Sequence, residues 1–450
     1  MITRREMIVS SAAVVTAGRG LLSAAEQARA DAPPPVRSDS QDGHGGDLPY
    51  TPVLTPNGNT LPWKLVDGVK VFHLVAEPVQ REFMPGLMLN CWGYNGQTPG
   101  PTIEVVEGDR VRIYVTNNLP EPTSVHWHGI LLPNGMDGVS GLNQKPIKPG
   151  ETFKYEFTLR QHGTHMYHPH FDEMVQMSMG LMGLFIIHPR HRPDPPIDRD
   201  FAIMLTEWRI DAGTGRPNPL EMTEFNILTF NSRAFPGTEP LIVKQGDRVR
   251  IRIGNLSAMS HHPIHLHGYQ FRITATDGGA IPESAQWPET TVLVPVGSTR
   301  NIEFVADAPG DWALHCHMTH HIMNQMGHGF PNMIAVKTDD LEPKIRRLVP
   351  DYMTMGTGGM SMEHAMKQPW NTVAMVGGKG PFATIDMGGM MTVLKVRSDI
   401  TSYQDPGWYD HAAGMVAEPV EWREVESNAP LYQPTTTAPA KKNAQEDHRH

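Results

Sequence analysis

Two stretches of the chain, PGPTIEVVEGDRVRIYVTNNL (residues 99–119) and TEPLIVKQGDRVRIRIGNLS (residues 238–257), share the core Gly-Asp-Arg-Val-Arg-Ile. Apolar and polar residues alternate through both cores. Because successive side chains of a strand point to opposite faces, this alternation predicts a half-buried β-strand in each stretch. The repetition indicates that one β domain occurs twice in the chain.

The composition agrees with such a fold. The chain has 450 residues, enough for two or three domains, and its 42 Gly and 40 Pro fit many turns between short strands. The formal net charge of −10, without a basic stripe, argues against nucleic acid as a partner. We therefore predict an all-β protein that does not bind nucleic acid.

The first residues have the features of an export signal. Arg4 and Arg5 precede an apolar stretch, residues 7–18, that is too short to span a bilayer. We predict a twin-arginine signal peptide over residues 1–30, a flexible leader over residues 31–48, and export to the periplasm without a membrane anchor. An ordinary secretory signal with an incidental pair of arginines is the alternative.

Both repeats continue into matching His-x-His pairs. Residues i and i+2 of a strand lie on the same face, so each pair presents two imidazoles side by side. The repeats predict domains over residues 49–190 and 195–338, followed by a Met- and Gly-rich, partly disordered C-terminal extension over residues 339–450. The eight paired residues are His126, His128, His168, His170, His265, His267, His315 and His317.

The residue types point to copper. The chain has 23 His and 27 Met, and copper is the metal that uses both imidazole and thioether ligands. Eight imidazoles are too many for one ion. Three ions with two or three histidines each would use them all and leave open positions for a small molecule, of which dioxygen is the obvious one.

A second kind of copper site is predicted around Cys316. If His315 and His317 face one side of a strand, Cys316 faces the other side. Blue-copper sites combine two His, one Cys thiolate and a weak axial Met, and suitable residues flank this cysteine. The candidate ligands are His262, Cys316, His321 and Met326.

The first repeat lacks this second site. It has Thr123 at the position of His262 and Pro169 at the position of Cys316. One thiolate site per chain is therefore expected, in the second domain. The remaining cysteine, Cys91, is predicted to be a small buried hydrophobic residue.

These signatures together resemble the multicopper oxidases over roughly residues 50–338. The resemblance implies two tandem cupredoxin-like Greek-key domains of barrel or sandwich type and four copper ions per functional unit. It implies type 2 copper at His126 and His265. It assigns the binuclear type 3 pair to His128, His168, His170, His267, His315 and His317, and type 1 copper to His262, Cys316, His321 and Met326.

The spacing between His170 and His262 is too short for a third domain of the kind found in many members. The chain therefore resembles the two-domain, small laccase-like branch of the family. That branch implies a homotrimer, with the trinuclear cluster between the first domain of one subunit and the second domain of the next.

The resemblance also implies a reaction. Four single electrons would pass from the Cys316 site to the histidine cluster and reduce dioxygen to water. Asp137 occupies a position where the family has an acid that assists proton delivery, and a plain Asp-Gly turn is the alternative interpretation. A second acid of some relatives is replaced by Ile322.

The electron donor is the least determined feature. Met-rich stretches at residues 352–366 and 385–391 favour a cuprous oxidase in copper tolerance, because thioethers select Cu(I). Packing is an equally acceptable interpretation of these methionines. The alternatives are a laccase acting on phenols and aromatic amines and, less favoured, a copper nitrite reductase or a non-catalytic copper carrier.

Overall fold

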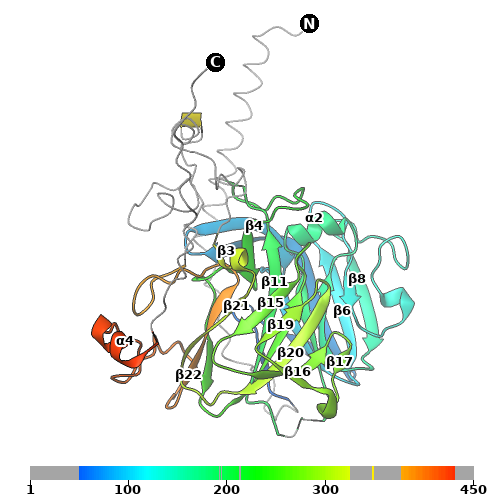
Figure 1. Ribbon diagram of the computed structural model, residues 1–450. Helices are drawn as coiled ribbons and strands as arrows, with labels where there is room; N and C mark the ends of the chain where they lie inside the picture. The colour runs from blue at the N-terminus through cyan, green and yellow to red at the C-terminus, as the bar shows by residue number, and fades with distance from the viewer. Residues whose placement is uncertain are drawn as a thin grey trace, which may run out of the picture. The chain divides into compact units, whose positions relative to one another are not determined.

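The computed structural model describes residues 50–191, 193, 195–211, 214–324, 347–348 and 377–430, in which strands dominate (Figure 1). The strands form two consecutive β-sandwiches, which confirms the all-β class with two tandem domains. No helix in this part of the chain is long and apolar enough to cross a membrane. The predicted signal peptide and leader lie outside the described residues.

The first sandwich pairs two sheets. One sheet has the order β2-β3-β6-β8, with β4 also on β3, and the other has the order β5-β10-β9-β7. Their bounds are β2 Trp63–Val66, β3 Val69–Met84, β4 Leu87–Tyr94, β6 Arg110–Asn117 and β8 Thr152–Thr158, then β5 Gly100–Val106, β7 His126–His128, β9 Gly163–His168 and β10 Gly183–His188. The strand β6 alternates as predicted, with Val111, Ile113 and Val115 buried.

The second sandwich repeats this plan. One sheet has the order β1-β11-β14-β20-β16-β17, with β12 on β11 and β18 on β16, and the other has the order β13-β22-β21-β15-β19. The bounds of the first sheet are β1 Val53–Leu54, β11 Arg199–Trp208, β12 Ile227–Phe230, β14 Arg248–Asn255, β16 Phe271–Thr276, β17 Gly279–Ala280, β18 Trp287–Glu289 and β20 Ser298–Val305. Those of the second are β13 Leu241–Lys244, β15 His262–Leu266, β19 Thr291–Val294, β21 Gly310–Cys316 and β22 Met391–Arg397.

The strand β22 comes from the segment that the sequence placed outside both domains. It pairs parallel with β13 and antiparallel with β21, as β10 pairs with β5 and β9 in the first sandwich. The second sandwich is therefore completed by a strand that follows a long insertion after β21 (Figure 1). The predicted boundaries stay predictions, but residues 339–450 contain an integral strand of the second domain.

A polar contact joins the two sandwiches. Arg252 of β14 is buried and makes two 2.8 Å bonds to the carboxylate of Asp200. Its remaining nitrogen donates to Thr164 of β9, whose hydroxyl donates to Asn301 of β20. Because a buried charge is tolerated only when it is paired, these bonds help fix the first sandwich against the second.

The place of β22 in the core can be tested by truncating one side chain. Leu394 is fully buried in the core cluster that contains Cys316. We expect Leu394→Ala to lower the free energy of unfolding of the copper-free protein by about 2–5 kcal/mol, measured by urea denaturation. Leu293→Ala, on the exposed face of β19, serves as the control and should change it by less than about 0.5 kcal/mol. Equal effects would contradict the assignment of β22 to the core.

Candidate metal centres

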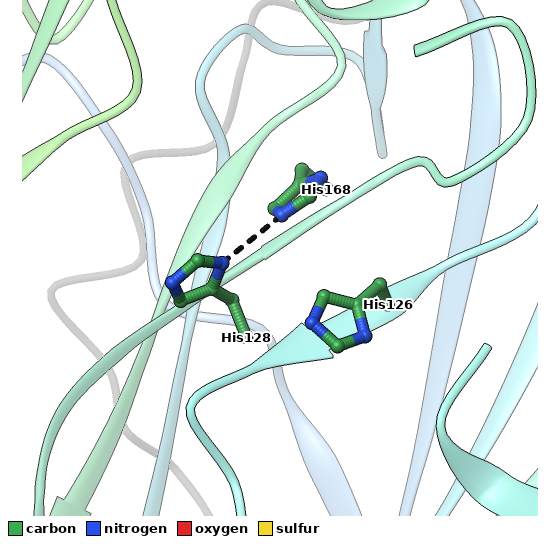
Figure 2. Close-up of side chains that lie close together, drawn as sticks. All are labelled: His126, His128 and His168. Carbon is green, nitrogen blue, oxygen red and sulfur yellow. Dashed lines mark hydrogen bonds between the residues drawn. The ribbon is translucent and has the colours of Figure 1, made fainter. Parts of the chain in front are cut away.

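The first centre lies where β7 and β9 run side by side. His126 and His168 are direct partners in this antiparallel pair, and His128 and His170 complete the group. Ring centroids within it lie 5.4–6.4 Å apart. Figure 2 shows three of these imidazoles converging, with the Nδ1 of His128 3.2 Å from the Nε2 of His168.

The second centre repeats the first on β15 and β21. His265 and His315 are direct partners there, and His267 and His317 complete the group. The Nε2 atoms of His267 and His315 lie only 3.0 Å apart. As the His-x-His spacing predicted, the two rings of each pair in this centre are in contact.

Backbone carbonyls fix the orientation of the rings in both centres. The Nδ1–H of His126 donates to Asp137 O at 2.8 Å, and that of His265 donates to Thr290 O at 2.7 Å. In the same way His168 donates to Pro169 O and His315 donates to Cys316 O. Since Nδ1 carries the proton in these four rings, Nε2 is left with its lone pair for a metal.

The two groups of four stay separate within one chain. Among the described residues, no hydrogen bond or ring contact links an imidazole of one group with an imidazole of the other. The Nε2–H of His128 donates instead to the carbonyl oxygen of Gly297 in the second sandwich, at 2.9 Å. Each centre thus presents a set of converging lone pairs with open positions.

The third centre contains the thiolate candidate. Because β21 alternates, Cys316 faces the core of the second sandwich while His315 faces the second centre. The Sγ of Cys316 lies 3.6 Å from the Nδ1 atoms of both His262 and His321, which are 3.2 Å apart. All three residues are buried. The fourth predicted ligand, Met326, lies outside the described residues.

Burial keeps this third centre uncharged when no metal is bound. Desolvation lowers the pKa of His262 to about 3 and that of His321 to about 4, and it raises the pKa of the Cys316 thiol to about 12. Two neutral imidazoles and a sulfur in a buried triangle suit a soft cation, which would deprotonate the thiol on binding. This donor set fits copper.

In the first sandwich, uncharged polar residues occupy the position that corresponds to the thiolate triangle. Thr123 stands in place of His262, and its hydroxyl donates to Gln176 at 2.7 Å. The fully buried Gln176 also donates to Pro122 O. A closed polar network therefore fills the position, and only the second sandwich has the thiolate triangle.

Carboxylates lie beside the first centre. Asp137 Oδ1 lies 3.5 Å from the Nδ1 of His126, and Asn143 donates to its other oxygen at 3.2 Å. The sequence did not single out Glu173 at the start of α2 (Glu173–Ser178). Its oxygens lie 3.4 Å from His168 and 3.9 Å from His170. The spacing of three residues from His170 was the available signal.

Three further sequence predictions concern Cys91 and the two Met-rich stretches. Cys91 is buried with a free thiol, and burial raises its pKa well above the usual range, as expected of a hydrophobic core residue. The 385–391 stretch lies in the described part of the chain and leads into β22, with Met390 and Met391 buried. These two methionines are core residues. The 352–366 stretch lies outside the described residues.

The lowered pKa of His321 predicts a pH-dependent stability of the copper-free protein. A neutral imidazole in the folded state and an ordinary pKa of about 6.5 in the unfolded state mean that the unfolded state binds more protons below that pH. Stability is therefore present above about pH 6.5 and is lost as the pH falls toward about 4. We expect His321→Gln to flatten the decline in urea midpoint between pH 7.5 and 5. The exposed His191→Gln is the control, and an equal flattening in both variants would contradict this expectation.

Comparison with known proteins adds independent support. The family model described as multicopper oxidase matches residues 76–192 and again residues 211–335. Copper resistance protein A of Escherichia coli is 30% identical over 41% of this chain and 38% of its own length. A protein of Kuenenia stuttgartiensis, named a probable nitrite reductase-hydroxylamine oxidoreductase fusion protein, is 30% identical over 58% of this chain and 31% of its own length.

A solved structure shares the fold over a larger part. The blue copper oxidase of Nitrosomonas europaea is 25% identical, with a TM-score of 0.55, and the match covers 75% of this chain and 91% of that one. The chain spans well under half of the length of the two curated relatives. The two family-model matches together cover more than half of the chain and include the triangle of His262, Cys316 and His321 and the paired histidines. The chain therefore belongs to the multicopper oxidase family.

Proposed function

We propose that this chain is an exported oxidase that couples four one-electron oxidations of a donor to the reduction of dioxygen to water. We also propose that its donor is Cu(I), in copper tolerance. The oxidase proposal rests on one observation. Three consecutive residues connect the buried thiolate triangle with the second histidine centre. Cys316 belongs to the buried thiolate triangle, and its neighbours His315 and His317 belong to an open histidine centre.

The residues at the end of β21 and His317, which follows it, connect these centres in two ways. Cys316 is covalently bonded to both neighbours, and the carbonyl oxygen of Cys316 accepts a 2.8 Å hydrogen bond from His315. When bound, copper would supply one-electron exchange at the thiolate triangle and multi-electron reduction of dioxygen at the histidine centres. The protein's contribution is to hold the rings with their lone pairs directed inward and to keep the triangle away from water.

Protons for this reaction need carriers near the histidine centres. We assign this role to Asp137, whose carboxylate lies beside His126 and is held by Asn143. Glu173 is the second candidate, because it lies next to His168 and His170 in a chain that has Ile322 where some relatives have an acid. Both carboxylates belong to the first centre.

The separation of the two histidine groups supports a shared cluster. Each group alone has four imidazoles with open positions, whereas a set of eight would hold three ions. We propose a homotrimer in which the first centre of one subunit meets the second centre of the next. Each such meeting would hold three copper ions, and with the thiolate site four per functional unit. This head-to-tail arrangement closes into a ring.

The shared cluster can be tested with complementary variants. One variant carries His128→Asn and His168→Asn, the other His267→Asn and His315→Asn, and each alone should consume no dioxygen with a dimethoxyphenol. Co-expression should restore about a quarter of the wild-type rate, because a quarter of random interfaces pair an intact first centre with an intact second one. Two variants altered only in the first centre serve as the control. If the complementary pair recovers no dioxygen uptake, the proposal of a shared cluster is contradicted.

The donor assignment rests on one relative and on one Met-rich stretch. Copper resistance protein A is one relative, and the Met-rich stretch at residues 352–366 suits Cu(I). A laccase acting on phenols remains the alternative, because donor pockets are formed by loops without motifs. The nitrite reductase alternative needs a thiolate site in the first domain, where Thr123, Pro169 and Gln176 stand instead.

Substitution of the methionines separates these donors. Deleting residues 339–450 is unsuitable because it removes β22. We would replace Met353, Met355, Met360, Met362 and Met366 by leucine in the full chain and measure dioxygen uptake with Cu(I) and with a dimethoxyphenol. A cuprous oxidase should lose about tenfold in turnover with Cu(I) and keep its rate with the phenol.

Two other outcomes would decide against parts of the proposal. If the phenol is the better donor and the leucine variant keeps both rates, the protein is a laccase. If the copper-loaded wild type has no thiolate-to-copper absorption band and consumes no dioxygen, the oxidase proposal fails. Cys316→Ser is the control, and it should abolish the band while leaving copper in the histidine centres.

A further inference from the structure

The ring of His262 is held at both ends. Its Nδ1 faces the Sγ of Cys316 and the Nδ1 of His321, and its Nε2 lies 2.7 Å from the hydroxyl of Ser257. Ser257 is 2% exposed and His262 is fully buried, so water does not compete for this bond. No other side chain in the described part of the chain bonds to the Nε2 of His262.

The loop that carries Ser257 is itself fixed. It joins β14 to β15, and the side chain of Asn255 accepts the N–H of Ser257 at 2.9 Å while donating to Ser260 O at 3.0 Å. The buried carboxylate of Glu207 accepts the N–H groups of Met259 and Ser260. These bonds order the backbone before any metal arrives, so the serine hydroxyl has a defined position.

The repeat shows which part of this arrangement belongs to the copper site. In the first sandwich Asn117 accepts the N–H of Leu119 at 2.9 Å, as Asn255 does for Ser257. The hydrogen bond between the asparagine side chain and the backbone of the following loop is therefore common to both copies. The serine hydroxyl is absent from the first copy. There the buried Leu119 corresponds to Ser257, and Thr123 corresponds to His262. The serine occurs only in the copy that also has the thiolate.

The chemistry of imidazole explains this pairing. A ring that binds a metal through Nδ1 carries its proton on Nε2, and a buried Nε2–H without an acceptor is costly. Ser257 Oγ is the acceptor within reach, and rotating the ring by half a turn would break the bond. An acceptor on the distal nitrogen also makes the ring a better electron donor to the metal.

We propose that Ser257 is a positioning residue of the thiolate copper site, which holds the Nδ1 of His262 toward Cys316 and strengthens that ring as a ligand. This inference rests on the proposed function, because it requires copper at the triangle. Since a more basic ligand stabilises Cu(II) over Cu(I), the serine lowers the reduction potential of this site.

The test compares three variants of the full-length, copper-loaded protein. Ser257→Ala removes the hydroxyl, Ser257→Thr keeps it, and Ser260→Ala removes a hydroxyl of the same loop that bonds to Glu207 instead. For each we would measure the affinity of the thiolate site for copper, its visible absorption band and its reduction potential. Thermal melting of the copper-free forms checks that all three fold.

We expect Ser257→Ala to weaken copper binding at this site by about tenfold or more, to shift the absorption band and to raise the potential. The threonine variant should stay within about twofold of wild type, because it retains the hydrogen bond. Ser260→Ala should leave the band and the potential unchanged.

Failure has two distinguishable forms. A wild type with the blue band, together with an alanine variant of wild-type affinity and potential, would overturn the role of Ser257 and leave the oxidase function intact. Equal losses in Ser257→Ala and Ser260→Ala, or in the alanine and threonine variants, would also overturn it, because they would indicate general loosening of the loop. A wild type without the band would overturn the proposed function itself.

Discussion

The alternation of side chains along β21 is the constraint on which the sites depend. Because neighbours on a strand face opposite ways, His315 belongs to an open histidine centre and Cys316 to the buried interior of the second sandwich. Two unlike candidate metal centres are thus formed by adjacent residues of the chain. A shift of one residue in the register of β21 would exchange the two faces and abolish both sites.

The two copies of the domain share one fold but differ in the residues at one buried position. Both copies keep the strand pair, the asparagine that locks the following loop, and histidines oriented by backbone carbonyls. At the buried position opposite the histidines the two copies differ. In the first copy Thr123 and Gln176 satisfy each other there, and in the second copy two imidazoles and a thiol leave lone pairs for a cation. The first arrangement satisfies its buried polar groups within the protein, whereas the second leaves them for a cation.

The short segment that leads into β22 contacts the residues of the thiolate triangle. Cys316 N donates to Met390 O, and Met390 N donates to His321 O, so the segment before β22 holds both the cysteine and the histidine in place. Gly389 adopts φ of +54° where a side chain would meet the carbonyl oxygen of His321. Cys316, His321 and the last strand of the sandwich are therefore fixed by the same backbone bonds.

The sequence by itself determined the duplicated strands, the histidines that share a face and the restriction of the thiolate to one copy, because the two-residue period of a strand is local. It left three things to the tertiary structure. These are the assignment of β22 to the second domain, the separation of the eight histidines into two groups, and the contacts of Glu173 and Ser257 with metal-facing rings. Apart from the three-residue spacing between His170 and Glu173, they depend on which distant segments lie side by side, and packing decides this without a local signal in spacing or composition.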